Sequence, residues 1–406
     1  MNQAADSKVE TAPLTLGVIS SIGVFGEGTQ WYTHVSFGRV LNLLAPKFRK
    51  LVFLAKAFQD RTTSMDCELD CDAIEVRPGP AFARSIDALR RPRPLLRSYR
   101  LLVQSSDVVF IRGMNPFSWY IHWCCARYRK PISHWLVGNP TELLRMHSRF
   151  GGMKDKLALW YTMTDERLLK IMARRSRAAF VVNGAELSQK WRRFSPDTVV
   201  SSTISREESR EREDTCQGAS IRLLFVGFVR PEKGLEYLIR AMPLVKSERP
   251  LELSIVGDRD GYPAETQNID RIIRELDLSE IVRWEGYARF GPELFDHLDN
   301  ADILVLPSLS EGTPRVLVEG RARCVPIIAT NVGGIPTSVR DSFDGLLVPP
   351  KAPRALADAI TRVIDDGELR RSHIRNGFAA AKTQCVEDFT VELYESIKRA
   401  VRLRQN

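Results

Sequence analysis

The chain of 406 residues lacks several features that would decide its class at once. No apolar run reaches about 18 residues, the length that a membrane-spanning helix needs, so we expect no transmembrane segment. Its polar, acidic start, Met1–Glu10, is not typical of a signal peptide. The 7 cysteines have no spacing typical of a zinc site, and an odd count without a secretory signal favours reduced thiols. We therefore expect a cytoplasmic protein.

Nucleic-acid-binding motifs are also missing: there is no helix-turn-helix, RNP or zinc motif. The net charge is nevertheless +9, and it is unevenly placed. Residues 1–215 hold 33 Lys and Arg against 22 Asp and Glu, whereas residues 216–406 hold 26 against 28. The basic first half implies an anionic partner, such as a phosphate or a membrane surface, and without a motif we expect no nucleic acid.

The second half of the chain alternates short apolar runs with segments that are apolar at three- and four-residue spacing. This alternation predicts βαβ units and a parallel sheet with helices on both faces. Strands that are buried on both faces are nearly all apolar, as these runs are. The expected strands are Ile221–Phe228, Leu251–Val256, Ile281–Glu285, Ile303–Leu306, Pro326–Thr330 and Gly345–Val348, and the clearest expected helices are Gly234–Lys246 and Ala264–Leu276.

The first half shows the same alternation less clearly. Its expected strands are Leu14–Ser20, Leu51–Ala55, Val108–Ile111, Ile132–Val137 and Ala179–Val182, and its expected helices are Trp31–Leu44, Ser118–Ala126 and Leu157–Ala173. We predict an α/β fold of two facing, doubly wound, Rossmann-like domains with a ligand in an interdomain cleft. The expected parts are residues 1–204, a charged linker at 205–220, a second domain at 221–385, and a last helix, 386–406, that packs back toward the first domain.

The strongest motif is PSLSEGTPRVLVEG, Pro307–Gly320, which follows an expected strand directly. Pro314 suits the first position of a helix, because its missing N–H has no partner there in any case. The free N–H groups and the dipole of such a helix start form a site for an anion such as a diphosphate. Glu311 precedes this helix and Glu319 lies inside it. A carboxylate can accept two hydrogen bonds from the vicinal hydroxyls of a ribose.

This segment resembles the E-x7-E signature of the retaining glycosyltransferases of family 4, which have the GT-B fold. Other motifs of that family follow in the same order over 221–350, whereas the first half resembles the family only in layout. These motifs are FVGFVRPEKGLEYL, LSIVGD, WEGY, ADILVLPSLSEGTP, VPIIATNVGGIP and DGLLVPP.

The resemblance implies roles for particular residues. Glu319 would hold the nucleotide ribose, Glu311 would contact the hydroxyls of the donor sugar, and Lys233 would bind the donor diphosphate. Further donor contacts would come from a short set of residues: Gly227, Gly257, Gly312, Thr313, Pro314 and Arg315. The family needs no metal ion and no other cofactor, because cations and helix starts neutralise the leaving diphosphate.

One departure from the family concerns the diphosphate. The family usually has Gly-Arg where this chain has Gly227 and Phe228, so a second cation is missing at its usual place. We hypothesise that Arg230, two residues on, replaces it. An inactive or divergent homologue stays open as an alternative, as does a nucleotide-sugar epimerase on the same fold.

Candidates in the first half are fewer. The stretch Gly23–Gln30 has the order G-x-x-G-x-G, which is not the dinucleotide fingerprint, but it lies where the family keeps a glycine loop near phosphates and acceptor. Gly26 and Gly28 are its candidates, and a plain turn is the alternative. Arg112 and Asn183 each end an expected strand and are candidate phosphate or acceptor contacts. His134 is a lone histidine that we interpret as structural.

Two remaining motifs are weaker. Asp258-Arg259-Asp260 spells D-x-D, a metal motif of the other large glycosyltransferase fold, and we set that use aside because it lies in the expected donor domain. Ala83–Leu102 mixes six arginines with leucines, and Pro92 and Pro94 break any continuous helix there. Basic and apolar residues together suit an anionic membrane surface, with a solvated loop as the alternative.

The expected function is therefore a retaining, metal-independent hexosyltransferase. It would move a sugar from a nucleotide-sugar donor to a saccharide or lipid-linked saccharide acceptor, in the synthesis of a surface polysaccharide or glycolipid. It would work in the cytoplasm or at the inner face of the cell membrane.

Overall fold

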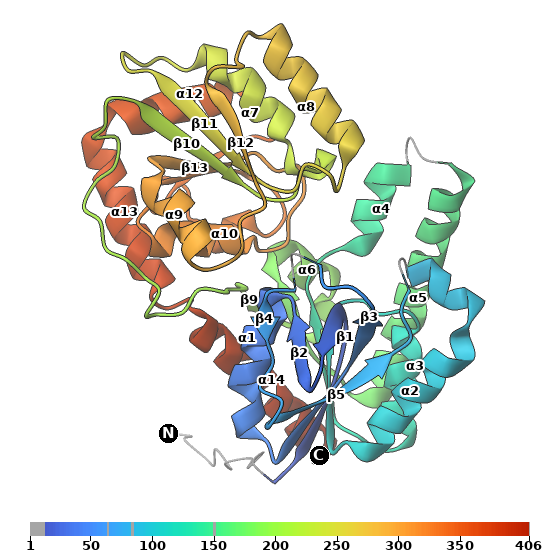
Figure 1. Cartoon of the computed structure of the whole chain (residues 1–406). Helices are drawn as coiled ribbons and strands as arrows, with labels where there is room; N and C mark the ends of the chain where they lie inside the picture. The colour runs from blue at the N-terminus through green and yellow to red at the C-terminus, as the bar shows by residue number, and fades with distance from the viewer. Residues whose placement is uncertain (1–12, 63–64, 83–84, 149–151, 406) are drawn as a thin grey trace. The chain divides into compact units, whose positions relative to one another are not determined.

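The computed structural model in Figure 1 describes residues 13–62, 65–82, 85–148 and 152–405. The prediction on Met1–Glu10 lies outside the described residues. Backbone contacts divide the chain into two compact units. The first holds Met1–Asn183, Leu187–Val199 and Thr390–Asn406, and the second holds Gly184–Glu186 and Val200–Phe389. Among the described residues, no helix combines the length and the apolar character needed to cross a membrane.

The second unit contains a parallel sheet in the order β12-β11-β10-β13-β14-β15. Its strands are β10 (Ile221–Val226), β11 (Leu251–Val256), β12 (Val282–Gly286), β13 (Ile303–Leu306), β14 (Ile327–Thr330) and β15 (Leu346–Val348). Numbered along the chain, this order is 3-2-1-4-5-6, that of a doubly wound Rossmann sheet. All six strands predicted in this half are confirmed, because burial on both faces leaves an apolar run that the sequence displays.

Helices cover both faces of this sheet (Figure 1). Leu223 and Phe225 of β10 face one core, with α7, α8 and α12, whereas Leu224 faces the other, with α9, α10 and α11. Helix α13 packs on α10. The helices are α7 (Leu235–Ala241), α8 (Pro263–Glu275), α9 (Pro292–Asn300), α10 (Arg315–Ala322), α11 (Ile335–Ser338), α12 (Pro353–Asp365) and α13 (Gly367–Ala381).

The first unit repeats the same topology. Its parallel strands lie in the order β5-β3-β1-β6-β7-β8-β9, and β2 and β4 pair antiparallel at the side of β1. The strands are β1 (Thr15–Glu27), β2 (Gln30–Thr33), β3 (Lys50–Phe58), β4 (Cys67–Glu68), β5 (Ile74–Gly79), β6 (Val108–Arg112), β7 (Ile132–Leu136), β8 (Ala179–Asn183) and β9 (Asp197–Val199). The five predicted strands are present, and β2, β4, β5 and β9 were not predicted.

The helices of the first unit are α1 (Val35–Leu44), α2 (Pro92–Ser105), α3 (Ser118–Arg127), α4 (Pro140–Ser148), α5 (Met153–Ser176) and α6 (Gly184–Lys190). The last helix, α14 (Val386–Gln405), joins this unit from Thr390 onward. There the Ser396 hydroxyl lies 2.8 Å from that of Ser133 on β7, and Arg399 binds Asp197 at 2.8 Å.

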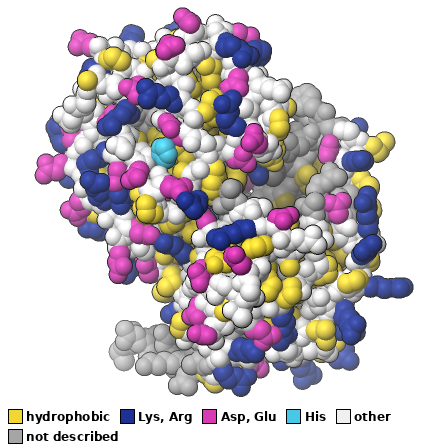
Figure 2. Space-filling model, in the orientation of Figure 1, with side chains coloured by type: hydrophobic (Ala, Val, Ile, Leu, Met, Phe, Trp, Pro, Cys, Tyr) yellow, Lys and Arg dark blue, Asp and Glu magenta, His cyan; other side chains and the backbone are white. Residues whose placement is uncertain are grey.

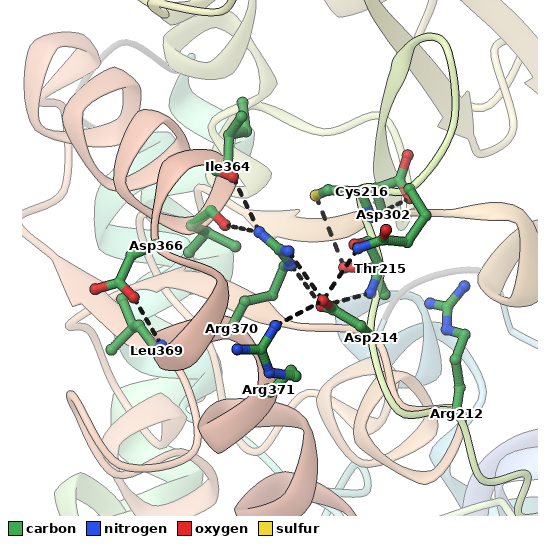
Figure 3. A network of polar contacts seen from close by, with 12 residues as sticks. Arg212, Asp214, Thr215, Cys216, Asp302, Ile364, Asp366, Leu369, Arg370 and Arg371 are labelled. Atoms are coloured by element: carbon green, nitrogen blue, oxygen red, sulfur yellow. Dashed lines mark hydrogen bonds and ion pairs between the residues drawn. The ribbon is translucent and has the colours of Figure 1, made fainter.

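The charged segment 205–220, which we expected to be a linker, packs on the second unit instead (Figure 3). Asp214 accepts hydrogen bonds from both Nε and Nη2 of Arg370 on α13, at 2.6 and 3.1 Å. Arg212 donates to the carbonyls of Asp299 and Ala301, each at 2.9 Å. The segment is polar because its charges pair with groups that lie far away in the sequence.

Candidate functional site

The carboxyl ends of β10 and β13 form the point at which strand order reverses in the second unit, where ligands of such sheets bind. The chain after β10 continues through Gly227 into the short 3-10 turn η4 (Pro231–Lys233). The chain after β13 runs through Glu311 into α10. The two loops are joined directly, because the Leu309 N–H donates to the Glu232 carbonyl at 2.7 Å. The loops 227–234 and 307–314 are therefore held together by a backbone hydrogen bond.

Lys233 and Glu311 form an ion pair within this structure: the ammonium contacts Glu311 Oε1. The Ser308 hydroxyl donates to the same oxygen at 2.9 Å. The two charged side chains are only 19% and 10% exposed, so water screens them weakly. Both residues were predicted for the site from the resemblance, and the structure brings them together. Ser308 was missed, although it lies inside the motif.

The backbone of Glu311 is held by the loop that follows β14. The Gly334 N–H donates to the Glu311 carbonyl at 3.1 Å. Gly333 has a φ of +55°, and a Cβ there would lie 1.9 Å from the same carbonyl oxygen. Only glycine combines this backbone conformation with so close an approach. The sequence displays this pair inside VPIIATNVGGIP, but its spacing does not reveal which carbonyl it approaches.

The Arg230 guanidinium lies over two aromatic rings, those of Phe228 and Tyr262, each with its centroid at 4.9 Å. Its Nη1 is 3.7 Å from Glu232 Oε1, and its buried Nε has no hydrogen-bond partner among the described residues. Phe228 thus occupies the family's arginine position and at the same time supports the arginine two residues on. Arg230 and Lys233 are also joined through the backbone, because the Lys233 N–H donates to the Arg230 carbonyl at 2.9 Å.

Residues 312–315 lead into α10, and their side chains contact the segment that enters the second unit. Buried Thr313 lies 2.9 Å from the Ser201 hydroxyl, and Arg315 Nη1 donates to the Thr203 hydroxyl at 2.6 Å. Pro314 is the residue before α10 rather than its first helical residue, which corrects our prediction; its ψ of 121° is extended. Ser201 and Thr203 were missed, because nothing in the sequence links them to a loop 112 positions away.

Four further donor candidates also lie in the second unit. Glu319 is buried in α10, with 4% of its surface exposed. Gly227 and Gly257 directly follow β10 and β11, and a Cβ on Gly257 would lie 2.2 Å from the Gly227 carbonyl oxygen. Gly312 is held as tightly, since a Cβ on Gly334 would lie 2.2 Å from its carbonyl oxygen.

In the first unit the expected glycine loop is a β-hairpin, which corrects our prediction of a loop followed by a helix from Trp31. Gly26 pairs with Trp31 across the two strands β1 and β2, and Gly28 forms the turn with a φ of +61°. The aromatic stretch after the turn favours a strand, and α1 begins only at Val35. A phosphate-binding role for Gly26 and Gly28 stays a prediction.

The other first-unit candidates take part in packing. The Arg112 guanidinium lies 5.2 Å and 5.0 Å from the ring centroids of Phe37 and Trp135. Asn183, 3% exposed, accepts the Trp135 indole N–H at 2.7 Å. His134 is buried and bonds the Gly113 carbonyl at 2.9 Å, and burial lowers its pKa to about 4. These contacts agree with a structural His134 and leave the ligand roles of Arg112 and Asn183 as predictions.

The D-x-D stretch forms a local turn: the Asp260 N–H donates to Asp258 Oδ1 at 2.9 Å, and Arg259 pairs with Asp270 on α8 at 2.8 Å. Arg259 also lies over the Trp284 ring, at 4.7 Å. The stretch therefore packs against its own unit.

Comparison with known proteins gives a family match in one part of the chain. Residues 206–379 match the family model of the glycosyl transferases group 1. The matched stretch lies within the second unit, Val200–Phe389. The D-inositol 3-phosphate glycosyltransferase of Streptomyces avermitilis is 30% identical over 253 residues, which cover 59% of this chain and 51% of that protein. The chain thus spans about half the length, or less, of the curated relatives that it matches.

Two solved structures superpose on nearly the whole chain. Anabaena HepE, solved in complex with UDP, superposes with a TM-score of 0.69 at 16% identity, over 95% of this chain and 99% of HepE. Sucrose-phosphate synthase from Thermosynechococcus elongatus gives 0.70 at 16% identity, over 96% and 99%. This likeness confirms the GT-B fold, with two Rossmann-like domains.

Proposed function

We propose that this protein is a retaining glycosyltransferase that moves a sugar from a nucleotide-sugar donor to a saccharide or lipid-linked saccharide. The observation that carries the proposal is the Lys233–Glu311 ion pair at the strand-order reversal of a group 1 domain. The nucleotide-sugar donor is further supported by HepE, which has this fold and has been solved with UDP, with UDP and glucose, and with UDP-glucose.

In the proposed donor complex, two cations neutralise the diphosphate. A lysine ammonium has three N–H donors, so Lys233 can bind Glu311 and a phosphate oxygen at once. Arg230 supplies the second charge from its place on Phe228 and Tyr262. The free N–H groups at the start of α10, beside Gly312 and Thr313, add further donors. No metal ion is required in this arrangement.

Glu311 and Glu319 serve the two sugars of the donor in this proposal. Glu311 accepts hydrogen bonds from hydroxyls of the transferred sugar, and Glu319 accepts those of the ribose. The bond between the anomeric carbon and the diphosphate oxygen breaks. The acceptor oxygen forms its bond on the same face, and its proton passes to the departing diphosphate, so the configuration is retained.

The acceptor would bind the first unit, near Gly26, Gly28, Arg112 and Asn183. A lipid-linked acceptor would bring the protein to a membrane surface, where surface polysaccharides and glycolipids are made. The matched D-inositol 3-phosphate glycosyltransferases act, by their names, on a phosphorylated acceptor, and a cationic first unit would suit such a group as well.

The test is a thermal-shift series with UDP, GDP and ADP on the wild type, Lys233→Ala and Glu319→Gln. A ligand at about 100 times its Kd stabilises by roughly 2.7 kcal/mol, which a melting curve detects. One nucleotide is expected to raise Tm, and both variants are expected to reduce the response. The exposed Lys246→Ala is the matched control and should respond like the wild type. If no nucleotide shifts the wild type, the inactive-homologue alternative is favoured. If a nucleotide binds but no sugar is transferred to added acceptors, an epimerase is tested next.

A further inference from the structure

The longest helix of the first unit, α5, turns an apolar stripe outward. Met153 and Trp160 are 81% and 64% exposed. Exposed apolar side chains continue along the same side of the helix, because residues three or four positions apart lie next to each other on its surface. The exposed members of the stripe are Met153, Leu157, Trp160, Leu168 and Ile171. A surface helix normally turns its apolar side inward, so this arrangement requires an explanation.

The packed side of α5 carries two acidic residues beside the buried Leu169 and Ala173. Glu166 accepts hydrogen bonds from Lys170, Lys190 and Thr141, each at 2.8 Å. Asp165 is buried as well, and burial raises its pKa to about 7. Both carboxyl groups are thereby withdrawn from the outer surface. The exposed charges of α5 are almost all positive: Lys154, Lys156, Arg167, Arg174 and Arg175.

The neighbouring helices extend this surface. Helix α3 packs against both α5 and α2. It presents Tyr120 stacked on Trp123, with ring centroids 5.4 Å apart, and Trp123 is exposed. Helix α2 exposes Arg93, Arg97 and Arg100, spaced so that they share one side, and none of them forms an ion pair with a described residue. Figure 2 shows Lys and Arg side chains with apolar ones between them along the right-hand edge of the view, over the region of α2.

We propose that the outward sides of α2, α3 and α5 form a docking surface for an anionic lipid bilayer. Apolar side chains enter the boundary between headgroups and acyl chains, Trp residues favour that boundary, and the arginines meet the lipid phosphates. A second copy of the chain fits less well, because a two-fold contact would place these same cations against each other. The inference rests on the proposed lipid-linked acceptor for its purpose, but the surface can be tested without any substrate.

The test is flotation of the full chain with vesicles of phosphatidylcholine, alone or mixed with phosphatidylglycerol. We expect binding to the mixed vesicles only. The triple variant R93Q/R97Q/R100Q should weaken binding by roughly 100-fold, because each cation near an anionic surface contributes about fivefold. Trp160→Ala should weaken it by at least about tenfold. Matched controls on the second unit, R271Q/R274Q/R283Q and Leu244→Ala, alter exposed side chains and should bind like the wild type.

Four outcomes would overturn the proposal: no flotation with anionic vesicles, equal binding to neutral ones, no effect of either first-unit variant, or an equal effect of the controls. A dimer in light scattering that Trp160→Ala dissociates would also overturn it and would assign the stripe to a second copy. The nucleotide-dependent rise in Tm is measured on the same variants. A variant that no longer floats with vesicles but still shows this rise in Tm has lost membrane binding and kept nucleotide binding. Failure of the docking surface can therefore be told apart from failure of the proposed function.

Discussion

The two units have the same order of parallel strands, but the chain continues differently at the carboxyl ends of corresponding strands. The first strand of the second sheet, β10, stops at Val226 and gives way to a loop that presents Arg230 and Lys233. The first strand of the first sheet, β1, continues to Glu27 and turns back through Gly28 as a hairpin. The same topological position therefore carries a cationic loop in one unit and a sheet extension in the other.

The same difference is seen after the fourth parallel strand along the chain in each unit, which is β13 in the second unit and β6 in the first. After β13, Ser308 and Glu311 direct polar groups toward Lys233. At the end of β6, Arg112 lies on the rings of Phe37 and Trp135. Topology thus determines where a site can form, and the loops after the strands determine whether charges there are presented to a ligand or are used in packing.

The prediction with the largest expected effect tests whether the segment 205–220 is a packed part of the second unit. Arg370→Met removes the nearest partner of Asp214 and leaves the longer contact with Arg371 at 3.3 Å. The Arg370 and Asp214 side chains are nearly buried, at 6% and 14% exposure. Burial alone would raise the pKa of Asp214, but hydrogen bonds from Arg370, the Thr215 N–H and Arg371, together with the charge of Arg370, outweigh it and lower the pKa. Breaking such a pair costs about 3–5 kcal/mol. For a unit of this size we expect a drop in Tm of roughly 10 °C, measured by calorimetry.

The control for this prediction lies on the same segment. Glu211 pairs with Lys382, and both are exposed, so Glu211→Gln should change stability by less than about 1 kcal/mol. Equal, small effects of the two changes would mean that 205–220 behaves as the linker that its composition suggested.

The second prediction concerns activity. Lys233→Ala should lower kcat by roughly 10²–10³-fold, the usual effect of removing one group that stabilises a developing charge. The measurement is transfer of labelled sugar from the nucleotide sugar whose nucleotide raises Tm. Exposed Lys246→Ala is again the control. A variant that keeps wild-type turnover would remove Lys233 from the mechanism and leave the ion pair with Glu311 as a structural contact.

The comparison also explains what the sequence could and could not predict. The strands of the second sheet are visible as apolar runs because both their faces are covered. In the first sheet, β5 was missed because Ile74–Gly79 is IEVRPG, in which polar residues and a Pro-Gly end mask the strand. The hairpin was missed because its glycines are equally typical of a loop.

Within the site, the residues that belong to contiguous motifs were predictable, and their tertiary partners were not. Lys233 and Glu311 stand in motifs, and each suits a donor site by its charge. Ser201, Thr203 and Tyr262 carry no such signal, because their roles depend on contacts with distant loops. The segment 205–220 was misjudged for the same reason, since the partner of Asp214 lies 156 positions away.

The third prediction tests the packed histidines of the first unit. His134 Nε2 bonds the Gly113 carbonyl, its Nδ1 lies 3.0 Å from His122 Nε2, and His122 Nδ1 lies 3.0 Å from the Ser176 hydroxyl. This chain of hydrogen bonds can form with one proton on each ring when the Ser176 hydroxyl donates to His122 Nδ1, and two neutral rings agree with the complete burial of both side chains. Burial lowers the pKa of His134 to about 4, and burial together with the neighbouring His134 lowers the pKa of His122 well below its usual value.

The direction in which the unfolding free energy changes with pH follows from these pKa values. Between about pH 4 and about pH 6.5 the unfolded chain binds a proton that the folded chain does not, so the unfolding free energy rises with pH. The contribution of His134 is about 3 kcal/mol, present above this window and lost as the pH falls through it. Urea unfolding of the wild type and His134→Gln across this range measures it, and the variant should show the shallower slope. Parallel slopes would contradict a neutral, buried His134.

The smallest expected effect compares two arginines that each lie on two aromatic rings, one in each unit. Arg230→Ala should raise the donor KM or lower turnover at least tenfold, since a charge-assisted hydrogen bond contributes roughly 1.5–3 kcal/mol. Arg230→Lys keeps the charge but loses the planar stacking on Phe228 and Tyr262, so its effect should be intermediate. At Arg112 the same change to Ala should affect the donor less, because the groups proposed to bind the diphosphate, Arg230 and Lys233, lie in the second unit. The measurement is the donor kinetics of Arg230→Ala, Arg230→Lys and Arg112→Ala, with Tm measured on the same proteins. Unchanged kinetics for Arg230→Ala would end its assignment as the second diphosphate cation, and an equal loss at Arg112 would show that donor binding does not depend on the second unit alone.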